Sequence, residues 1–497
     1  NVNPITRLDY PDPDVIRVED TYYMASTTMH FMPGCEILQS FDLVHWEHVT
    51  YVYETLDHTD AQQLKSGQNI YGQGMWAASL RYHEGRFYIC FVANDTRKTY
   101  LYTSEKIDGP WKKQLIEGFY HDGSLLFDED GRNYIVYGND EIWITELNED
   151  LTAPKKDGLH RLLVSDHKNP ELGYEGSHIQ KINGYYYIFL VHSLRDRWMR
   201  TEACFYSDSL EGEFTGGDVL CDDRGYCGQG VAQGGIVDTP DGKWYAMLFQ
   251  DSGAVGRIPI LLPVTWKDHF PFFGQNGHVP EEIEVHSTRP GYIYQPLVGS
   301  DDFCNGLLPR WQFNHDPDPR YYHLDALQGT YTITTREVCT ELTQAVNTLT
   351  QRMSYPSCAA EVTVDASALK EGDVAGLCAL QSCYAAVGIT KHHGKYEVLM
   401  LDKKEDGILD MTEGTVVESH QMDFRLEADF CNMKDEARCY YRVNKGDWLP
   451  IGTVHKLYFK LDHFTGCRFG LFCYAAEETG GSACFRDFKY YDVDEIS

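Results

Sequence analysis

The sequence lacks any run of about 18 consecutive apolar residues, the length needed to cross a bilayer, so it holds no candidate membrane-spanning helix. It is also poor in positive charge, because 43 Lys and Arg stand against 75 Asp and Glu, for a net charge of -32. Nucleic acid and an anionic membrane surface would both be repelled, and we expect neither as a partner. A polyanionic polysaccharide is disfavoured for the same reason, whereas a neutral carbohydrate is not.

The 15 cysteines include no Cys-x-x-Cys pair, and their number is odd. Several of them, such as Cys90, Cys204 and Cys473, lie inside strand-like runs. Buried free thiols in a reducing compartment fit this distribution better than a disulfide framework or a zinc site. We therefore predict a cytoplasmic protein. The chain opens Asn1-Val2-Asn3-Pro4 without a charged and apolar leader, so we expect a signal peptide to be absent or already removed.

Sustained helical periodicity is missing as well, which argues against α/β folds. What is present instead, over about the first 290 residues, is a repeated unit in which an acidic or Asn-Gly turn precedes an aromatic strand. Asp-Gly and Asn-Gly between strand runs are strong hairpin signals, because type I′ turns need positive φ. Five such units, roughly 45 to 65 residues apart, predict a five-bladed β-propeller. The units begin near Glu19, Glu84, Glu129, Asn183 and Pro240.

The pattern changes after residues 288–291, where alternating strands such as 396–401 and 438–443 begin. Strands with one apolar and one polar face predict a two-sheet sandwich. At 497 residues the chain is also too long for one core. We predict an all-β protein with a propeller over residues 1–295 and a jelly-roll-like β-sandwich over residues 296–497, packed directly on it. The stretch 311–315 is the candidate for the interface or the pocket mouth, with a core position for Trp311 as the alternative.

Three carboxylates stand in matching contexts, each just before a blade's first strand: Asp12, Asp122 and Glu175. Asp12 lies between two prolines, and we expect its backbone to be stiff and extended. First strands line the channel of a propeller, so the three side chains should converge there. One of them should then hold a proton near neutral pH, which suits glycoside hydrolysis. A turn residue entering a strand is the simpler interpretation of each one alone, but their shared register argues against coincidence.

The segments around these three carboxylates, together with residues 76–82 and 255–259, resemble motifs of glycoside hydrolase family 43. This family comprises the five-bladed β-xylosidases, arabinofuranosidases and arabinanases. The resemblance covers about the first 290 residues, with the motifs in the family's order. The residues after the change of pattern resemble the C-terminal domain of the longer, exo-acting members. The motifs lie in the segments 10–28, 76–82, 122–125, 175–178 and 255–259.

The resemblance implies a role for each carboxylate. Asp12 would be the general base, Asp122 the group that orients the acid and tunes its pKa, and Glu175 the general acid, with inversion by a single displacement. Arg257 matches the arginine that fixes the hydroxyls of the terminal sugar, and a solvated turn arginine is the alternative. Trp76 matches an aromatic wall for the pentose, and a core tryptophan is the alternative.

Other site residues follow from the resemblance less directly. Met29 stands where relatives often place a Phe, and could equally pack in the core. Many relatives have a channel histidine, sometimes with calcium, where this chain has Ala232 and Gln233. We therefore expect no metal and no cofactor. His121 and His178 are expected to be hydrogen-bonding members of the site wall.

We predict an exo-acting, inverting α-L-arabinofuranosidase with β-xylosidase activity beside it, acting on small oligosaccharides or arabinoxylan. β-Xylosidase as the main activity and a non-catalytic sugar-binding propeller are the alternatives. The sucrose- and fructan-cleaving propellers are another, but this chain lacks their Trp-Met-Asn-Asp-Pro-like start. The sequence leaves the oligomeric state open.

Overall fold

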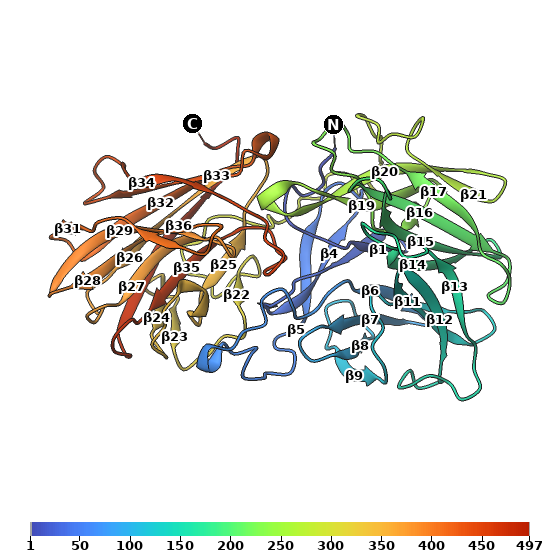
Figure 1. Cartoon of the computed structure of the whole chain (residues 1–497), viewed down its shortest axis with the longest axis horizontal. Coiled ribbons are helices and arrows are strands. Elements are labelled where there is room, and N and C mark those ends of the chain that lie inside the picture. Colours follow the sequence, from blue (N-terminus) through green and yellow to red (C-terminus); the bar gives the residue numbers. More distant parts are fainter. Residues whose placement is uncertain (1, 497) are drawn as a thin grey trace.

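The computed structural model describes residues 2–496 and contains two β-domains that lie side by side (Figure 1). Five four-stranded antiparallel sheets form the N-terminal domain, each with its strands in chain order. This is the blade arrangement of a β-propeller. The structure thus confirms the predicted five-bladed propeller followed by a β-sandwich.

The strands of the five blades follow one another along the chain. The first blade has β1 (Asp14–Val18), β2 (Thr21–Ser26), β4 (Gly34–Ser40) and β5 (Glu47–Tyr53). The second has β6 (Ser79–His83), β7 (Arg86–Ala93), β8 (Lys98–Ser104) and β9 (Lys112–Ile116). The third has β10 (Ser124–Phe127), β11 (Asn133–Asn139), β12 (Glu141–Leu147) and β13 (His160–Ser165). The fourth has β14 (Glu175–Ile182), β15 (Tyr185–Ser193), β16 (Arg200–Ser207) and β17 (Thr215–Leu220). The fifth has β18 (Ile236–Asp238), β19 (Trp244–Asp251), β20 (Arg257–Lys267) and β21 (Phe270–Phe273).

Two of the predicted hairpins turn through left-handed residues. Glu84 and Gly85, between β6 and β7, have φ of 48° and 80°. Asn183 and Gly184, between β14 and β15, have φ of 51° and 85°. Two consecutive positive φ values are typical of type I′ turns, whose twist matches that of the flanking strands. The turn residues therefore set the first hairpin of these two blades.

The C-terminal domain is a sandwich of two antiparallel sheets. One has nine strands in the order β3-β22-β25-β35-β27-β28-β29-β30, with β31 paired to β29, and the other has seven in the order β23-β24-β36-β26-β32-β33-β34. β3 (Phe31–Met32) lies between β2 and β4 of the first blade in the chain, yet it pairs with β22 (Gln312–Asn314) of the sandwich. The propeller therefore contributes an edge strand to the sandwich.

The other sandwich strands lie between residues 322 and 491. They are β23 (Tyr322–Asp325), β24 (Thr330–Thr334), β25 (Leu349–Arg352), β26 (Ser357–Asp365), β27 (Val374–Leu380), β28 (Ala385–His392), β29 (Lys395–Lys403), β30 (Leu409–Met411), β31 (Thr415–Val417), β32 (Gln421–Asp429), β33 (Glu436–Arg442), β34 (Leu449–Lys456), β35 (Arg468–Tyr474) and β36 (Ser482–Tyr491). The predicted domain boundary, between residues 295 and 296, lies in the connection between β21 and β22.

Helix is confined to short 3-10 turns in the described part of the chain: η1 (Lys65–Gly67), η2 (Gly253–Val255), η3 (Leu342–Gln344) and η4 (Cys431–Met433). Within residues 2–496, none of these helices has the length and apolarity to cross a membrane.

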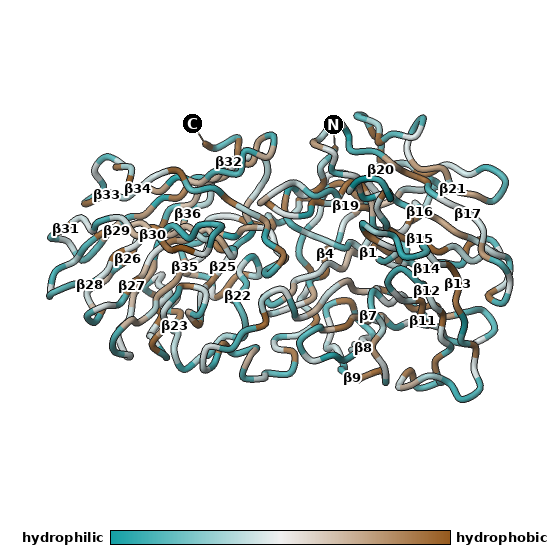
Figure 2. Tube along the Cα trace, viewed as in Figure 1, coloured by the Kyte–Doolittle hydropathy of each residue, from teal (hydrophilic) through white to brown (hydrophobic). Residues whose placement is uncertain are grey.

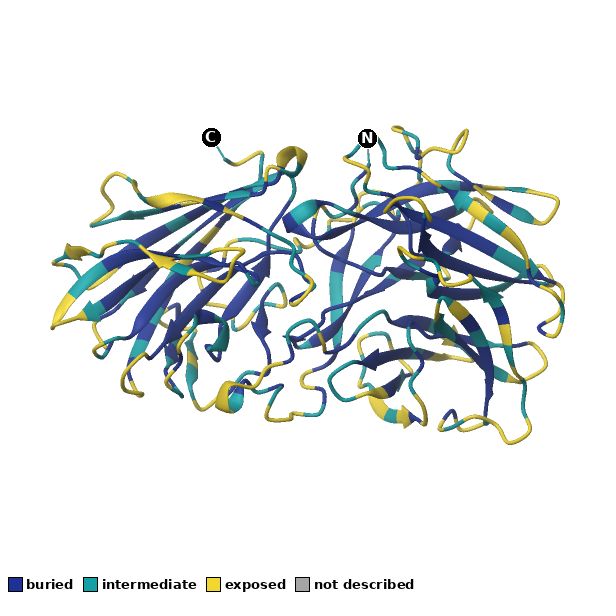
Figure 3. Cartoon of the chain, viewed as in Figure 1, coloured by how far each residue is buried: buried dark blue, intermediate teal, exposed yellow. Residues whose placement is uncertain are grey.

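The apolar cores follow the central strands, which are brown in Figure 2 and buried in Figure 3. The largest cluster fills the sandwich, but it also includes Ala254, Val255 and Ile258 from the last blade, all 0 % exposed. Its apolar surface is therefore continuous across the domain boundary. Burial of this kind is the main force that holds two domains together.

A buried ion pair also joins the domains. Arg352 of β25 lies 2.9 Å from Glu36 of β4, and each side chain is only 3 % exposed. The same guanidinium donates to the Asp9 carbonyl at 2.8 Å and lies 4.0 Å from the centre of the Tyr10 ring. Removing either partner of such a pair leaves an uncompensated buried charge. The two domains therefore have a fixed arrangement.

The stretch 311–315 has two roles. Trp311 is buried in the sandwich core, as the alternative interpretation held. Gln312 and Asn314 instead reach the propeller, where their amides donate to the Pro33 carbonyl and the Tyr71 hydroxyl, both at 2.6 Å. The stretch is thus part of the interface, but none of its residues lines the pocket described next.

Candidate active site

The three predicted carboxylates meet in one small pocket of the propeller. Met29, Trp76 and Arg257, the predicted substrate contacts, line the same pocket. The structure therefore brings together the three predicted carboxylates and the three predicted substrate contacts. The full lining is Asp12, Met29, Trp76, Ala77, His121, Asp122, Glu175, Arg200, Gln233, Arg257 and Phe464.

The backbone at Asp12 differs from the prediction. Its φ is 55°, which is left-handed and not extended. Pro13 disfavours the right-handed helical region for the residue before it, and aspartate is one of the few residues that tolerate the left-handed one. Asp122 has φ of 48°. Backbone strain of this kind concentrates at functional sites, where it aims a side chain that regular strand geometry would direct elsewhere.

Three donors hold the Asp12 carboxylate. The Thr27 hydroxyl donates to Oδ2 at 2.6 Å, and the Gln233 amide donates to Oδ1 at 2.7 Å. Arg257 donates to Oδ1 from 3.3 Å. The carboxylate is nearly buried, so these bonds fix its orientation relative to the pocket.

Asp122 and Glu175 form a second group on the facing blades. The Gly176 N–H donates to Asp122 Oδ2 at 2.8 Å, and the Asn139 amide donates to Glu175 Oε2 at 3.2 Å. His121 Nε2 lies between the carboxylates, 3.3 Å from Asp122 Oδ2 and 3.2 Å from Glu175 Oε2. Backbone and ring together thus fix the two carboxylates relative to each other.

This cluster shifts two pKa values. Burial would raise the pKa of Asp122, but the His121 charge and the bonds from His121 and Gly176 hold it below its usual range. Burial lowers the pKa of His121, but attraction to Asp122 and Glu175 outweighs this and raises it to about 11. His121 is therefore charged across the neutral range.

The same cluster contains the only group of three potential metal-donor atoms in residues 2–496 that lie within 4.8 Å of one another. The ring nitrogen of His121 contacts both carboxylates, which is the geometry of a protonated ring held between two carboxylates. In this arrangement the three side chains form a network of hydrogen bonds and opposite charges.

A second network lies behind the pocket and joins the first strands of four blades. Arg81 of β6 pairs with Asp14 of β1 at 3.0 Å and donates to the carbonyls of Leu125 in β10, at 2.9 Å, and Ile179 in β14, at 3.0 Å. His178 contacts Asp14 at 3.0 Å. His178 is thus hydrogen-bonded as expected, but it lies outside the pocket lining and supports the wall from behind.

Sequence reasoning missed Phe464, which closes one side of the pocket. It belongs to the C-terminal domain, in the connection between β34 and β35, and its ring stacks on Trp76 at 5.7 Å with planes 4° apart. The Arg257 guanidinium lies 4.6 Å from the centre of the same ring. No local pattern marks Phe464, because its contacts come from another domain.

Arg200 was also missed, although a signal existed. It opens β16 just as Arg257 opens β20, and both are the third strands of their blades. Its Nε donates to Asp251 at 2.9 Å, and its guanidinium lies 5.3 Å from the centre of the Phe249 ring. Gln233 was noted only as a replacement for a histidine, whereas in the structure it holds the Asp12 carboxylate.

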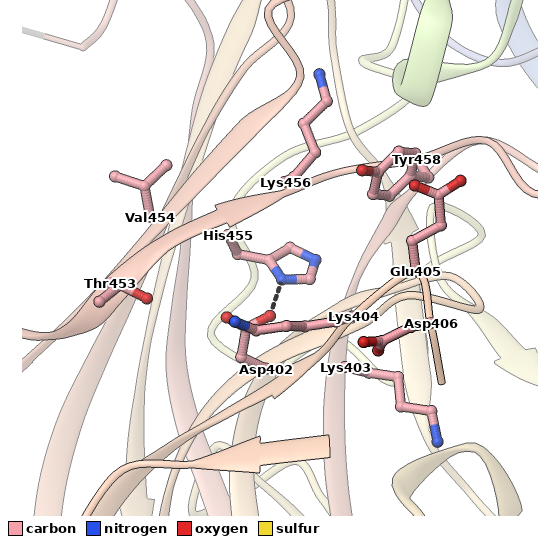
Figure 4. A pocket seen from close by; sticks show the side chains of 10 residues that line it. All are labelled: Asp402, Lys403, Lys404, Glu405, Asp406, Thr453, Val454, His455, Lys456 and Tyr458. Atoms are coloured by element: carbon pink, nitrogen blue, oxygen red, sulfur yellow. Dashed lines mark hydrogen bonds and ion pairs between the residues drawn. The ribbon is translucent and has the colours of Figure 1, made fainter. Parts of the chain in front are cut away.

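A larger cleft of about 590 Å³ lies in the sandwich, between residues 402–406 and 453–458 (Figure 4). His455 occupies its middle, where Nδ1 contacts Asp402 at 2.7 Å and Nε2 contacts the Cys383 carbonyl at 2.8 Å. Both ring nitrogens are thus engaged in structural contacts. Its acidic lining residues, Asp402, Glu405 and Asp406, all come from one side, so no two carboxylates face each other across the cleft. Cleft size alone therefore does not identify a catalytic site.

A propeller pocket that gathers three carboxylates offers the pair of carboxyl groups that glycoside hydrolysis requires. Residues 2–271 match the family model for glycosyl hydrolases family 43, and residues 300–491 match that for the beta-xylosidase C-terminal concanavalin A-like domain. The chain therefore belongs to glycoside hydrolase family 43, as the resemblance implied.

Two curated relatives illustrate the range of the family. A beta-xylosidase from Formosa agariphila is 26 % identical, with 99 % of this chain and 89 % of the relative covered. A non-reducing end alpha-L-arabinofuranosidase from Bacteroides ovatus is 24 % identical, with 82 % and 79 % covered. Relatives of similar distance thus carry either activity in their names.

Solved structures agree in fold. A bifunctional GH43-CE protein of Bacteroides eggerthii superposes with a TM-score of 0.93 at 42 % identity, over 100 % of this chain and 64 % of that one. This chain thus spans just under two thirds of that protein's length. A GH43 glycoside hydrolase engineered to display both endo-xylanase and exo-arabinofuranosidase activity superposes with a TM-score of 0.86 at 27 % identity, over 99 % of both chains.

Proposed function

We propose that the protein is an exo-acting, inverting glycoside hydrolase that releases terminal α-L-arabinofuranosyl residues, with β-D-xylosyl release beside it, from hemicellulose-derived oligosaccharides or arabinoxylan. The observation that carries the proposal is a small pocket in which Asp12 and Glu175 lie on separate blades while Phe464 walls one side. The pocket is small, and the stacked rings of Trp76 and Phe464 line it. A pocket walled on that side would admit a terminal sugar but not an internal stretch of polymer.

The proposed reaction is one displacement. Asp12 takes a proton from water, whose oxygen attacks the anomeric carbon. Glu175 gives its proton to the glycosidic oxygen as the bond from that oxygen to the anomeric carbon breaks. Asp122 supports the acid through the Gly176 N–H and His121. Attack on the face opposite the leaving group inverts the configuration.

The remaining side chains would position the sugar. Arg257 and Arg200 offer cationic donors to its hydroxyls, since each bears a guanidinium at the pocket. Trp76 and Phe464 offer aromatic faces to its C–H surface. Met29 fills a remaining part of the wall. Such contacts raise the rate by holding the anomeric carbon between the base and the acid.

β-Xylosidase as the main activity is the second candidate. It is favoured by the match of residues 300–491 to a beta-xylosidase C-terminal domain and by the Formosa agariphila relative. The two pentoses present similar hydroxyl patterns to one pocket, so dual activity is consistent with either assignment.

Hydrolysis of 4-nitrophenyl α-L-arabinofuranoside and 4-nitrophenyl β-D-xyloside tests the proposal. We expect release from both, with the higher kcat/KM for the arabinofuranoside. The reverse order would establish the β-xylosidase. Binding of pentosides without any hydrolysis would refute an enzyme and leave a sugar-binding propeller.

We further propose that the protein works in a reducing compartment, the cytoplasm. All fifteen cysteines are free thiols, and many of them are buried. This supports the proposal, because buried thiols that form no disulfide persist where thiols are kept reduced. Secretion in a disulfide-bonded form would contradict it.

A further inference from the structure

His121 lies between Asp122 and the proposed acid, Glu175. Its Nε2 lies 3.3 Å from Asp122 and 3.2 Å from Glu175, and its side chain is 21 % exposed. The ring also meets Trp76 edge-on, with centroids 6.1 Å apart. One ring nitrogen thus contacts two carboxylates that come from different blades.

The contacts favour a charged ring. Two carboxylates near one nitrogen stabilise the imidazolium ion over the neutral imidazole, and the ring is mostly shielded from solvent. The charge of His121 also compensates that of Asp122, so the pair is close to neutral as seen from Glu175. Without the ring, Asp122 would oppose a second negative charge on Glu175.

Other charged or titratable groups face this cluster from the neighbouring strands. Arg200 of β16 interacts electrostatically with Glu175 and with Asp12, and His178 of β14 does so with Asp122. Asp12 itself is paired with Arg257. Arg200 and the Asp12–Arg257 pair keep their charges whether or not His121 is charged, so they do not replace the charge of His121.

His121 also determines which carboxyl oxygen of Glu175 is free to carry the proton. Glu175 Oε2 accepts from both His121 and Asn139. Among the described residues, Oε1 of Glu175 has no hydrogen-bond partner. Oε1 is therefore the oxygen left to carry the proton to the substrate.

We propose that His121 is a positioning residue that acts through Glu175: its imidazolium ion holds Oε2, leaves Oε1 to the leaving group, and stabilises the carboxylate that forms when the proton departs. This rests on the proposed function of Glu175 as the acid. As the O–H bond of Glu175 breaks, the proton passes to the glycosidic oxygen, and the new negative charge arises beside the positive ring. His121 thereby sets the upper end of the pH range in which the acid works.

His121→Gln tests this, because glutamine keeps a donor but removes the charge. On an alkyl pentoside or an unactivated oligosaccharide, we expect the alkaline limb of kcat/KM to move to higher pH by about 1 unit or more, with kcat lowered about 10- to 100-fold. Asp122→Asn should move the alkaline limb of kcat/KM to lower pH. The double variant His121→Gln/Asp122→Asn lacks both charges, so its alkaline limb should lie closer to that of the wild type. A dinitrophenyl pentoside, which needs no proton, should show little loss of kcat in His121→Gln.

His83→Gln is the matched control, because His83 stacks on Phe127 at 4.6 Å outside the pocket lining and its replacement should leave the limb in place. His121→Asn provides a second variant if His121→Gln does not fold. A limb that stays in place or moves to lower pH in both folded variants would overturn the proposal.

A readout independent of activity separates this inference from the proposed function. In enzyme labelled with 15N-histidine, the signals that vanish in His121→Gln belong to His121. We expect them to show an imidazolium ion up to pH 9. Titration in the ordinary range of a free imidazole, near about 6.5, would overturn the inference even if the enzyme is active. An inactive enzyme with a charged His121 would refute the proposed function alone.

Discussion

The rings of Trp76 and Phe464 lie parallel, with planes 4° apart and centroids separated by 5.7 Å. Trp76 belongs to the propeller, and Phe464 belongs to a loop of the sandwich. The two rings wall the same pocket. Neither domain alone therefore has the complete pocket.

Phe464→Ala should weaken the hold on the terminal sugar without removing the acid or the base. We expect kcat/KM to fall about 10- to 100-fold, the worth of burying one aromatic face. Phe464→Tyr is the matched control and should retain most of the activity, because it keeps the ring. Steady-state kinetics on a 4-nitrophenyl pentoside measures both. Equal activity of Phe464→Ala and wild type would show that the wall is not used.

Asp12→Ala and Glu175→Ala should each lower kcat by about 10²–10⁴, the usual worth of a positioned acid or base. The Glu175 variant should lose less on a dinitrophenyl glycoside, because that leaving group needs no proton. The Asp12 variant should lose equally on both substrates. Near wild-type turnover of unactivated oligosaccharides by either variant would make its assigned role wrong.

Features that depend on local or periodic sequence patterns could be predicted from the sequence. The turn residues and aromatic strands predicted five blades, and the register of Asp12, Asp122 and Glu175 at strand entrances placed all three in one pocket. The left-handed backbone of Asp12 was missed, because the constraint from a following proline leaves more than one region open. Phe464 was missed because its role depends on how two domains dock, which no local pattern encodes.

Buried histidines at the domain interface should make stability depend on pH. The rings of His30 and His315 lie 5.0 Å apart, and His463 stacks on Tyr71 at 3.9 Å. Burial lowers the pKa of His30 well below 6.5, and His315, His463 and Arg468 lower it further. Burial and the neighbouring His463 lower the pKa of His315 in the same way. Burial lowers the pKa of His463 to about 4.

The sign follows from proton linkage. Below about pH 6.5 the unfolded chain binds protons at these rings and the folded protein does not, so the free energy of unfolding falls as pH falls from 6.5 toward 4. The melting temperature should drop by several degrees over this range. His30→Phe should flatten the drop, and His286→Gln, at a side chain 64 % exposed, should not. A melting temperature that is constant from pH 6.5 to 4 would contradict the linkage.

Residues 1–295 expressed alone should be poorly soluble and should lose activity. The truncation removes Phe464 from the pocket and uncovers apolar side chains of the last blade, among them Val255 and Ile258. It also leaves Glu36 without its partner Arg352. Solubility and the rate of release from 4-nitrophenyl pentosides measure the effect. A soluble truncation with full activity and unchanged preference for terminal sugars would refute the role of the sandwich as a pocket wall.

The most direct test of the central claim is proton NMR of the anomeric signal during hydrolysis of 4-nitrophenyl α-L-arabinofuranoside. A single displacement by water, with Asp12 as base and Glu175 as acid, predicts that the β-anomer of arabinose appears first and then mutarotates. If the α-anomer appeared first, the configuration would be retained and the single-displacement account would be contradicted.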